Sequence, residues 1–364
     1  MVEFKKVFSE FLNKNIISCK PLGGGNINPT YLIEAEASPE SEKYVLQRIN
    51  TSVFKDVDSL MNNIFSVSEF LGKKVSAQGV HSRKNVLTFI KTSDQKNYFT
   101  DSEGCCWRLS YYISDSASYD TPETPEMFNK CGFALGEFER LLSDFPAETL
   151  AETIPDFHNT QKRYEDFKAA LSRDSVGRAH SAKEQIDSLT ELYDDCKKFL
   201  DFIEEKQLPI RVTHNDTKFN NFLFDKASGE YICMVDFDTI MPGYSIYDFA
   251  DAVRSGANLT GECETDLSRV SLSLEYFEAF ASGYLKAASK YLSQKEIDCL
   301  ACSVFVLSFE CAARFLADYL DGDVYFKTDY DNHNLERARN QLALSYDIKD
   351  KMAEMTSIIK ELTF

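Results

Sequence analysis

A non-helical segment set among helices is the feature that most constrains the fold of this chain. Residues 210–243 lack helical periodicity, whereas residues 183–204 before them and 266–290 after them repeat apolar side chains at helical spacing. The segment contains the pattern H-x-D-x-x-x-x-N and, fifteen residues after the asparagine, a further aspartate; these residues are His214, Asp216, Asn221 and Asp236. The stretch FLFDKASGEYICMVD between them has the alternation of a β-hairpin. We therefore expect a tight loop and a returning hairpin to bring these side chains to one point.

These residue types at these offsets are the ones that phosphoryl transfer to a hydroxyl requires. In that reaction an aspartate, here Asp216, orients the attacking hydroxyl and accepts its proton. Asn221 and Asp236 would hold Mg²⁺, because hard oxygen ligands suit this ion and the ion neutralises phosphate charge. Each residue alone would indicate little, since Asp, Asn and His commonly cap turns. Together they predict a kinase-like phosphotransferase that uses ATP and Mg²⁺.

The first third of the chain has the pattern of a small antiparallel sheet. Apolar and polar residues alternate in PTYLIEAE and EKYVLQRIN, and two further strand-like stretches follow a helical pattern at 56–74. A polar, proline-bearing stretch at 114–125 ends this region, and 364 residues favour two domains. We predict an α+β, protein-kinase-like fold with a β-rich nucleotide-binding lobe and hinge at 1–113 and a mainly helical catalytic and substrate lobe at 114–364. Helices are expected in the second lobe at 126–142, 183–204, 266–290, 295–320 and 335–359.

Glycines between two predicted strands are expected to cover the phosphates of the nucleotide. A glycine-rich turn lets backbone N–H groups approach phosphate oxygens without obstruction by side chains. Such a turn is commonly only a turn, so the interpretation depends on its place upstream of the Asp216 segment. The residues concerned are Gly24, Gly25 and Asn26.

The strand YVLQRIN is expected to provide the cation of the nucleotide site. Kinases place a lysine on the third strand, and Arg48 could bind two phosphate oxygens at once. An exposed strand arginine is the alternative, and Glu69 on the next helix is one acid that could pair with Arg48. The strand around Trp107 would lead into the hinge, where the backbone of Tyr112 or Ile113 is expected to recognise adenine.

Three segments around the polar pattern also carry a family resemblance: THNDTKFNN at 213–221, VDFDTIMPG at 235–243 and YDFADAVR at 247–254. They resemble the aminoglycoside phosphotransferase superfamily of kinase-like folds, and most closely its N-acetylhexosamine 1-kinase branch. The similarity runs nearly end to end. It implies ATP-dependent transfer of the γ-phosphoryl group to the anomeric C1 hydroxyl of an N-acetylhexosamine, GlcNAc or GalNAc, with Asp216 as general base and Mg²⁺ as cofactor.

The same resemblance suggests where the sugar would bind. A free sugar carries no charge, so its pocket should offer hydrogen-bonding side chains and a flat aromatic ring. The candidates on the predicted helix FECAARFLADYL are Arg314, Asp318 and Tyr319, and His158 from ETIPDFH is a further one. Asp238 could touch the substrate or order the PGY turn that follows it. Arg314 and Asp318 are four residues apart, so an ion pair within the helix is the alternative for Arg314. Asp248 and Asp251 are expected to cap and brace the helix YDFADAVR.

Charge and cysteine usage limit the partners and the compartment. The formal net charge of −18 works against binding of nucleic acid or of an anionic membrane surface. The ten cysteines are scattered, and charged residues interrupt the N-terminal stretch MVEFKKVFSEFLNK, so reduced thiols in a cytoplasm are expected. The apolar run at 300–309 is too short to span a bilayer and predicts a buried helix. The expected partners are ATP and a small sugar, without nucleic acid or membrane, for a monomer or a weak homodimer.

Two other functions are compatible with parts of this pattern. An acidic surface would also attract a cationic acceptor, such as an aminoglycoside or a choline-like amine, but that site needs clustered carboxylates beside Asp216. The acids at 321–323 and 263–265 are the available candidates. A catalytically inactive, nucleotide-sensing scaffold is disfavoured, because the base, the asparagine and the metal aspartate of the kinase template are all present.

Overall fold

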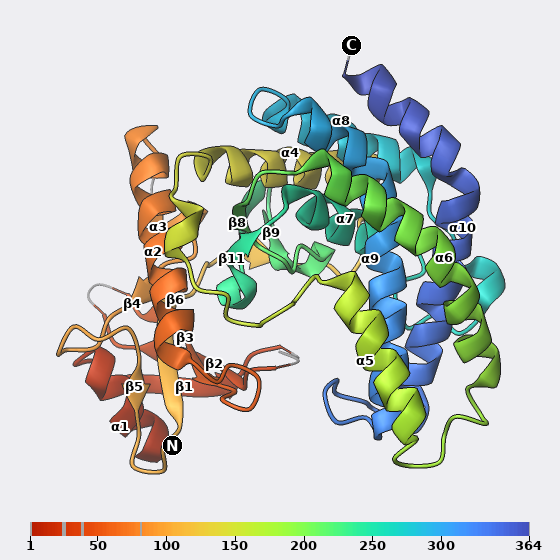
Figure 1. Cartoon of the computed structure of the whole chain (residues 1–364). Coiled ribbons are helices and arrows are strands. Elements are labelled where there is room, and N and C mark those ends of the chain that lie inside the picture. The colour runs from red at the N-terminus through yellow and green to blue at the C-terminus, as the bar shows by residue number, and fades with distance from the viewer. Residues whose placement is uncertain (1, 24–26, 38–39, 81, 364) are drawn as a thin grey trace. The chain divides into compact units, whose positions relative to one another are not determined.

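The chain divides into two compact units, each built from separate segments (Figure 1). The computed structural model describes residues 2–23, 27–37, 40–80 and 82–363. The first unit comprises Met1–Ala117, Asp144–Pro155 and Leu223–Pro242, and the second comprises Ser118–Ser143, Asp156–Phe222 and Gly243–Phe364. The division near residue 117 lies close to the boundary expected at 113. Two later segments also join the first unit, which a single boundary did not anticipate.

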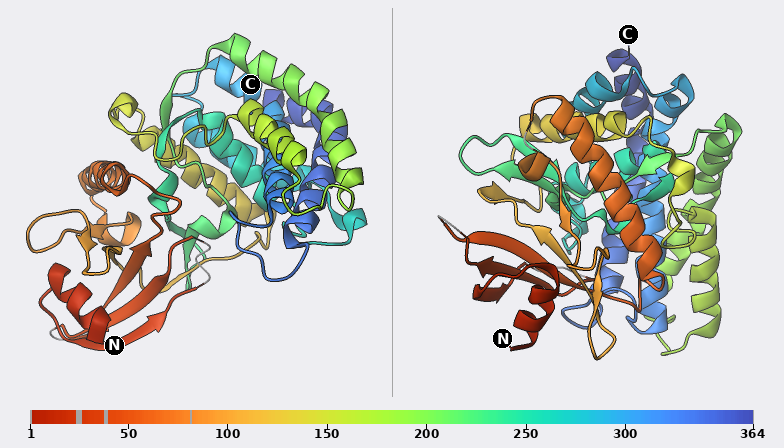
Figure 2. Two further views of the ribbon diagram at one scale, coloured as in Figure 1. Left: turned by 60° about the horizontal axis from the view of Figure 1, so that its bottom comes forward. Right: turned by 90° about the vertical axis from the view of Figure 1, so that its left-hand side faces the viewer.

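An antiparallel sheet forms the core of the first unit. Its strand order is β1-β2-β3-β6-β4, and β5 pairs with β6. The strands are β1 (Ile16–Pro21), β2 (Thr30–Ala35), β3 (Glu42–Ile49), β4 (Phe89–Ile90), β5 (Phe99–Thr100) and β6 (Cys106–Tyr111). Alternate residues such as Tyr44 and Leu46 point to one face, and Phe8 of the helix α1 (Val2–Phe11) packs against them. Figure 2 shows α1, at the N-terminus, beside the sheet. We call this the outer face of the sheet.

The opposite, inner face of the sheet is approached by α2 (Val57–Ala77), whose Phe65 ring lies 5.9 Å from the Phe89 ring of β4. Asp56 caps α2 by accepting a hydrogen bond from the Ser59 backbone N–H, which satisfies one of the free donors at the helix start. Apolar side chains at helical spacing bury one side of α2. The short helices α3 (Ser82–Asn85) and η1 (Ala147–Thr149) also belong to this unit.

The predicted hairpin joins the first unit. β9 (Phe222–Asp225) pairs with β10 (Tyr231–Met234) and with β7 (Ser116–Ala117), through the register Ser116↔Asp225 and Ala117↔Phe224. This pairing with a strand near residue 117 explains why the later segment belongs with the first third of the chain. The 3₁₀ helix η3 (Phe237–Thr239) follows the hairpin, and then β11 (Met241–Gly243).

Helices make up the second unit, with α9 (Gln294–Asp321) at its centre (Figure 1). α9 contacts α5 (Thr160–Arg173), α6 (Lys183–Lys206), α7 (Ser245–Gly256) and α10 (His333–Leu362). Its start has a capping box, in which Ser293 and Glu296 satisfy each other's backbone N–H groups. Within the described ranges, α9 is the one helix with the length and apolar composition of a membrane span, but 89% of its most apolar window is buried inside the protein.

Two other helices of this unit, α4 (Pro125–Leu141) and α8 (Leu274–Ala288), touch at their backbones because glycines face the crossing. A Cβ atom on Gly132 would lie 2.1 Å from the Phe280 carbonyl oxygen, and one on Gly283 would lie 2.0 Å from the Asn129 carbonyl oxygen. Any side chain at these two positions would force the helices apart.

The α+β prediction is confirmed: an antiparallel sheet and a helical region are both present. Four of the expected helices in the second lobe agree with α4, α6, α9 and α10 to within a few residues. The expected helix at 266–290 is shorter than predicted. Residues Leu267–Arg269 form a separate 3₁₀ turn, η4, and α8 begins at Leu274, after Ser273 accepts the Tyr276 backbone N–H.

Candidate active site

The loop that carries the polar pattern leaves the short strand β8 (Arg211–Thr213) and ends in the 3₁₀ turn η2 (Phe219–Asn221). Asn215 turns the chain with a left-handed φ of 62°, a conformation that asparagine tolerates better than most residues. This turn allows the side chains of Asp216, Lys218 and Asn221 to meet. Asp216 and Lys218 remain partly exposed, while Asn221 is buried.

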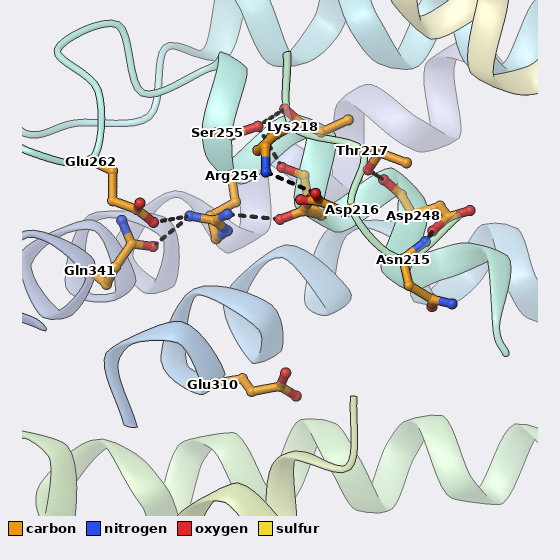
Figure 3. A network of polar contacts seen from close by, with 12 residues as sticks. Asn215, Asp216, Thr217, Lys218, Asp248, Arg254, Ser255, Glu262, Glu310 and Gln341 are labelled. Atoms are coloured by element: carbon orange, nitrogen blue, oxygen red, sulfur yellow. Dashed lines mark hydrogen bonds and ion pairs between the residues drawn. The ribbon is translucent and has the colours of Figure 1, made fainter. Parts of the chain in front are cut away.

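The neighbours of Asp216 favour its ionised form, and Lys218 lies beside its carboxylate (Figure 3). Lys218 Nζ donates to Asp216 Oδ2 at 2.8 Å, and Asn221 Nδ2 donates to the same oxygen at 3.1 Å. Burial opposes ionisation, but Lys218, His214 and Asn221 outweigh it and lower the pKa of Asp216. Oδ1 of Asp216 has no hydrogen bond to any described residue. A carboxylate in this state can accept a hydrogen bond from a hydroxyl.

Asn221 is arranged to offer one oxygen. Its Nδ2 donates to the Asp216 carbonyl oxygen at 2.8 Å as well as to the carboxylate, so the amide orientation is fixed. No described residue donates to Asn221 Oδ1. Such an oxygen fits Mg²⁺, which prefers hard oxygen ligands and usually takes only one or two from the protein when phosphates supply others.

Asp248 of α7 holds the loop in place through three hydrogen bonds. Its carboxylate accepts the His214 backbone N–H at 2.7 Å and the Asn215 backbone N–H at 2.6 Å, and its carbonyl oxygen accepts Thr217 Oγ1 at 2.5 Å (Figure 3). Asp248 is fully buried, and burial raises its pKa to about 7 although the two backbone N–H groups act in the opposite direction. Asp248 was expected to cap and brace its own helix, but its carboxylate holds the loop instead. Asp251 instead pairs with Arg254 one turn later, at 2.7 Å.

A second brace reaches the loop from α9. His158 contacts the Asn215 carbonyl oxygen through Nε2 at 3.2 Å and the Glu310 carboxylate through Nδ1 at 3.0 Å. The His158 ring thus links the loop to Glu310 of α9. Glu310 is fully buried; burial would raise its pKa, but His158, Arg314 and Thr160 lower it. His158 was expected as a possible sugar contact. Its two nitrogens are instead used to hold the loop.

Asp236, the second expected Mg²⁺ ligand, belongs to the first unit and lies two residues after the end of β10. It has a left-handed φ of 69°, and it is exposed although its neighbours Phe237 and Asp238 are buried. Non-glycine residues in this conformation cost free energy and are found preferentially at functional sites. The conformation turns Asp236 out of the packed segment.

The hinge residues present a matching donor and acceptor. The Ile113 N–H and the Tyr112 carbonyl have no hydrogen-bond partner among the described residues, whereas Tyr112 N–H donates to the Lys43 carbonyl oxygen at 3.1 Å. Ile113 packs in a small apolar cluster with Ile232 and Cys233. An adenine edge needs one donor and one acceptor, and its ring needs apolar neighbours. Recognition of adenine at Tyr112 and Ile113 stays a prediction, and these groups suit it.

The structure places Arg48 on the outer face of β3. Arg48 is exposed and lies opposite Trp107 on β6. Burial alone would raise the pKa of Asp101, but hydrogen bonds from Trp107 and from two backbone N–H groups, together with the charge of Arg48, lower it. Gln47, one position earlier, lies on the inner face. The suggested pairing of Arg48 with Glu69 does not form, because Glu69 pairs with Lys91 at 3.2 Å. The expected phosphate-covering residues Gly24, Gly25 and Asn26 lie outside the described residues.

Asp238 was expected as a substrate contact, and its surroundings do not support that role. It is buried, with one carboxylate oxygen bound by Arg108 and the other by Asn28 Nδ2 at 2.5 Å. Both oxygens are thus used within the first unit. The 3₁₀ helix η3 begins after Asp236, and the buried Asp238 lies within it.

Arg314 remains a candidate for the acceptor. It is partly exposed, and its guanidinium carbon lies 5.0 Å from the Phe157 ring centre, 5.5 Å from that of Phe326 and 6.0 Å from that of Tyr325. The alternative ion pair with Asp318 does not form. Asp318 accepts the backbone N–H groups of Val324, Tyr325 and Phe326 and thereby fixes the loop that carries two of these rings.

Tyr319, the other helix residue expected at the sugar, is a core residue. It is 2% exposed, its hydroxyl donates to Asn332 Oδ1 at 3.0 Å, and Arg178 lies over its ring at 4.6 Å. The two residues of α9 therefore lie in different surroundings: Arg314 faces the aromatic rings, and Tyr319 faces the protein interior.

Sequence reasoning missed three residues of the site: Lys218, Glu310 and Arg108. Lys218 had a signal, since it lies two residues after the candidate base within the same pattern. Glu310 had a weaker one, as a lone acid in the apolar face of a predicted core helix, where a buried charge needs a partner. Arg108 had a comparable signal within the apolar strand CCWRLSYYI.

Comparisons with known proteins give a family and a fold for this chain. The family model described as "Phosphotransferase enzyme family" matches residues 18–291. Among solved structures, spectinomycin phosphotransferase in complex with ADP and spectinomycin has a TM-score of 0.61 at 12% identity, covering 97% of this chain and 98% of its own. An aminoglycoside phosphotransferase from Alicyclobacillus acidocaldarius has a TM-score of 0.57 at 12% identity, covering 98% and 96%. An ethanolamine kinase from Plasmodium vivax has a TM-score of 0.55 at 14% identity, covering 93% and 85%.

These structural similarities concern the fold. At identities of 12–14% they support the predicted kinase-like architecture and carry no information about the acceptor.

Proposed function

The chain belongs to the phosphotransferase enzyme family, and on this premise we propose that it transfers the γ-phosphoryl group of ATP to the anomeric C1 hydroxyl of an N-acetylhexosamine. The observation that carries the proposal is the loop in which Asp216, Lys218 and Asn221 meet and which Asp248 holds from below. Such an arrangement would serve as the catalytic loop of a kinase, in which positioning and charge stabilisation provide most of the catalysis.

Asp216 acts as the general base. Its ionised carboxylate orients the C1 hydroxyl and takes the proton as the oxygen bonds to phosphorus, and the bond to the departing ADP oxygen breaks. The lowered pKa of Asp216 keeps the carboxylate ready to accept that hydrogen bond at neutral pH. Lys218, at 2.8 Å from Asp216, places a positive charge where the transferred phosphoryl group would carry negative charge.

Asn221 and Asp236 would hold Mg²⁺. Bound there, the ion would neutralise phosphate charge and fix the geometry of the triphosphate. The Asn221 oxygen, which accepts no hydrogen bond from a described residue, supports its part of this assignment, and the part of Asp236 rests on the sequence pattern.

Rigid support of the loop is part of the proposal. Misplacing a reacting group by about 1 Å can cost about 100-fold in rate. Asp248 fixes the backbone N–H groups before Asp216, and His158 fixes the Asn215 carbonyl. The base is therefore positioned before substrate arrives.

The charges near Arg314 favour an uncharged acceptor over a cationic one. Burial and the positive charge of the nearby Arg314 lower the pKa of Arg163, although Glu310 and Asp166 act in the opposite direction. The carboxylates that a cationic acceptor would need are already paired: Asp321 with Arg173, Asp323 with Arg178, and Glu264 with Arg269. Arg314 with its aromatic neighbours offers hydrogen-bond donors and flat apolar surface, which suit a sugar acetamide and ring.

The test is release of ADP by the purified full-length chain with ATP and Mg²⁺, measured separately for each acceptor. GlcNAc, GalNAc, glucose, galactose, choline, ethanolamine and kanamycin form the panel. An N-acetylhexosamine is expected to give the highest kcat/KM, and the Arg314→Met variant is expected to lose most of this preference while Lys295→Met, a surface control, does not. Highest kcat/KM for an amine would show that the acceptor assignment is wrong. ADP release with none of the seven would contradict the assigned acceptor class.

A further inference from the structure

Five polar side chains form a closed ring inside the first unit. Asp238 binds Asn28 Nδ2 at 2.5 Å on one side and Arg108 on the other. Thr30 Oγ1 donates to the Asn28 carbonyl oxygen at 2.9 Å, and Gln47 Nε2 donates to Thr30 Oγ1 at 3.1 Å. Arg108 Nε closes the ring by donating to Gln47 Oε1 at 3.0 Å. The ring thus links β2, β3 and β6 to the segment directly after Asp236.

Arg108 is the cation of this ring, and one end of it is unused. Arg108 is 2% exposed, and its guanidinium carbon lies 5.5 Å from the Phe89 ring centre. Nε binds Gln47 and Nη1 binds Asp238. Among the described residues nothing accepts a hydrogen bond from Nη2. Nη2 is also not among the fully buried unpaired atoms, so it borders accessible space. A buried guanidinium with free donors is ready for an anion.

At Gln47 the inner face of β3 lacks a cation that could hold the nucleotide phosphates, and Arg108 on the neighbouring strand can supply one. Kinases place a lysine on the third strand to hold the nucleotide phosphates. The inner-face residue of β3 is Gln47, which has no charge, and the cation Arg48 lies on the outer face. Arg108 stands directly opposite Gln47 on the neighbouring strand β6 and shares the inner face. Arg108 precedes the hinge residue Tyr112 by four residues, which is about 13 Å along a strand. A nucleoside triphosphate whose base binds at the hinge can reach over that distance.

We propose that Arg108 is the phosphate-binding cation of the nucleotide site, with Gln47 and Asp238 holding its guanidinium in place. Gln47 then orients the cation rather than supplying one, and Asp238 balances the buried charge until phosphate arrives. The proposal rests on the proposed use of ATP and specifies which side chain binds its phosphates.

The experiment compares binding of adenosine and of ADP with Mg²⁺ by the full-length chain, measured by calorimetry. Arg108→Met is expected to weaken ADP binding by about 10-fold to 100-fold, the range of a charge-assisted hydrogen bond, and to leave adenosine binding within about twofold. Arg108→Lys keeps the charge but not the planar fork and is expected to fall between the two. Arg83→Met, which removes an exposed cation of the same unit, is the matched control and is expected to change neither.

Fluorescence of Trp107, the only tryptophan, reports whether the first unit of each variant is folded. If Arg108→Met does not fold, the Arg108→Lys result decides, through the same ratio of ADP to adenosine affinity. An equal loss of both affinities would mean that Arg108 only supports the fold, and unchanged ADP binding would exclude it from the phosphate site; either result overturns this inference and leaves the proposed function standing. A wild-type chain that binds no ADP would overturn both.

Discussion

Removal of the Asp248 carboxylate should weaken both the fold and the catalysis. Asp248→Ala leaves the backbone N–H groups of His214 and Asn215 without an acceptor at a fully buried position. Each buried unsatisfied donor costs about 1–3 kcal/mol, so the variant should lose about 2–6 kcal/mol of unfolding free energy. That is a large share of the about 5–15 kcal/mol that stabilises an ordinary domain.

The assay is urea unfolding followed by helical circular dichroism at about pH 6, paired with kcat on the preferred acceptor. Asp56→Ala is the matched control, because Asp56 also accepts a backbone N–H but at an exposed helix start, where the loss should be about 1 kcal/mol. Folded Asp248→Ala should also lose about 100-fold or more in kcat, because the loop no longer holds Asp216 in place. A variant within about 1 kcal/mol of wild type and with unchanged kcat would refute the bracing role.

Three further predictions follow from the same loop. Asp216→Asn should lower kcat by about 100-fold to 10,000-fold without changing the melting temperature by more than a few degrees; near wild-type turnover would remove Asp216 as the base. His158→Gln should lower kcat by about 10-fold or more with little change in the KM for ATP, since the ring supports the Asn215 carbonyl. A rise in the acceptor KM alone would favour a sugar contact for His158 and contradict the supporting role. The pKa of Asp248 is raised from 3.8 to about 7, so ionisation of this carboxyl destabilises the fold. In urea titrations, the unfolding free energy of wild type should therefore fall relative to that of Asp248→Asn as pH rises from about 4 through about 7, by up to about 4 kcal/mol. A wild-type unfolding free energy that rises with pH relative to that of Asp248→Asn would contradict this.

The sequence predicted the parts of the site that depend on local spacing. The offsets within the H-x-D-x-x-x-x-N pattern were enough to expect that Asp216 and Asn221 meet, because a short loop leaves few other arrangements. The helices α4, α6, α9 and α10 were predicted because apolar residues repeat at 3.6-residue spacing over many turns.

The parts that depend on long-range contacts were not predictable in the same way. His158 and Glu310 are separated by about 150 residues, and their contact could not be read from either neighbourhood. The pairing of β7 with β9 similarly moved residues 223–242 into the first unit. Asp238 and Arg48 show a third limit: a single 3₁₀ turn or one step along a strand changes the face to which a side chain points.

The central claim is that this chain moves phosphate from ATP to the anomeric oxygen of an N-acetylhexosamine, with Asp216 as the base. The most direct measurement is ³¹P and ¹H NMR of the product formed by the wild-type chain from ATP and the N-acetylhexosamine that gives the higher kcat/KM. We predict a sugar phosphate whose phosphorus couples to the C1 proton, formed at a rate at least about 100-fold lower by Asp216→Asn. A product phosphorylated at another hydroxyl, or release of free phosphate without a sugar phosphate, would contradict the claim.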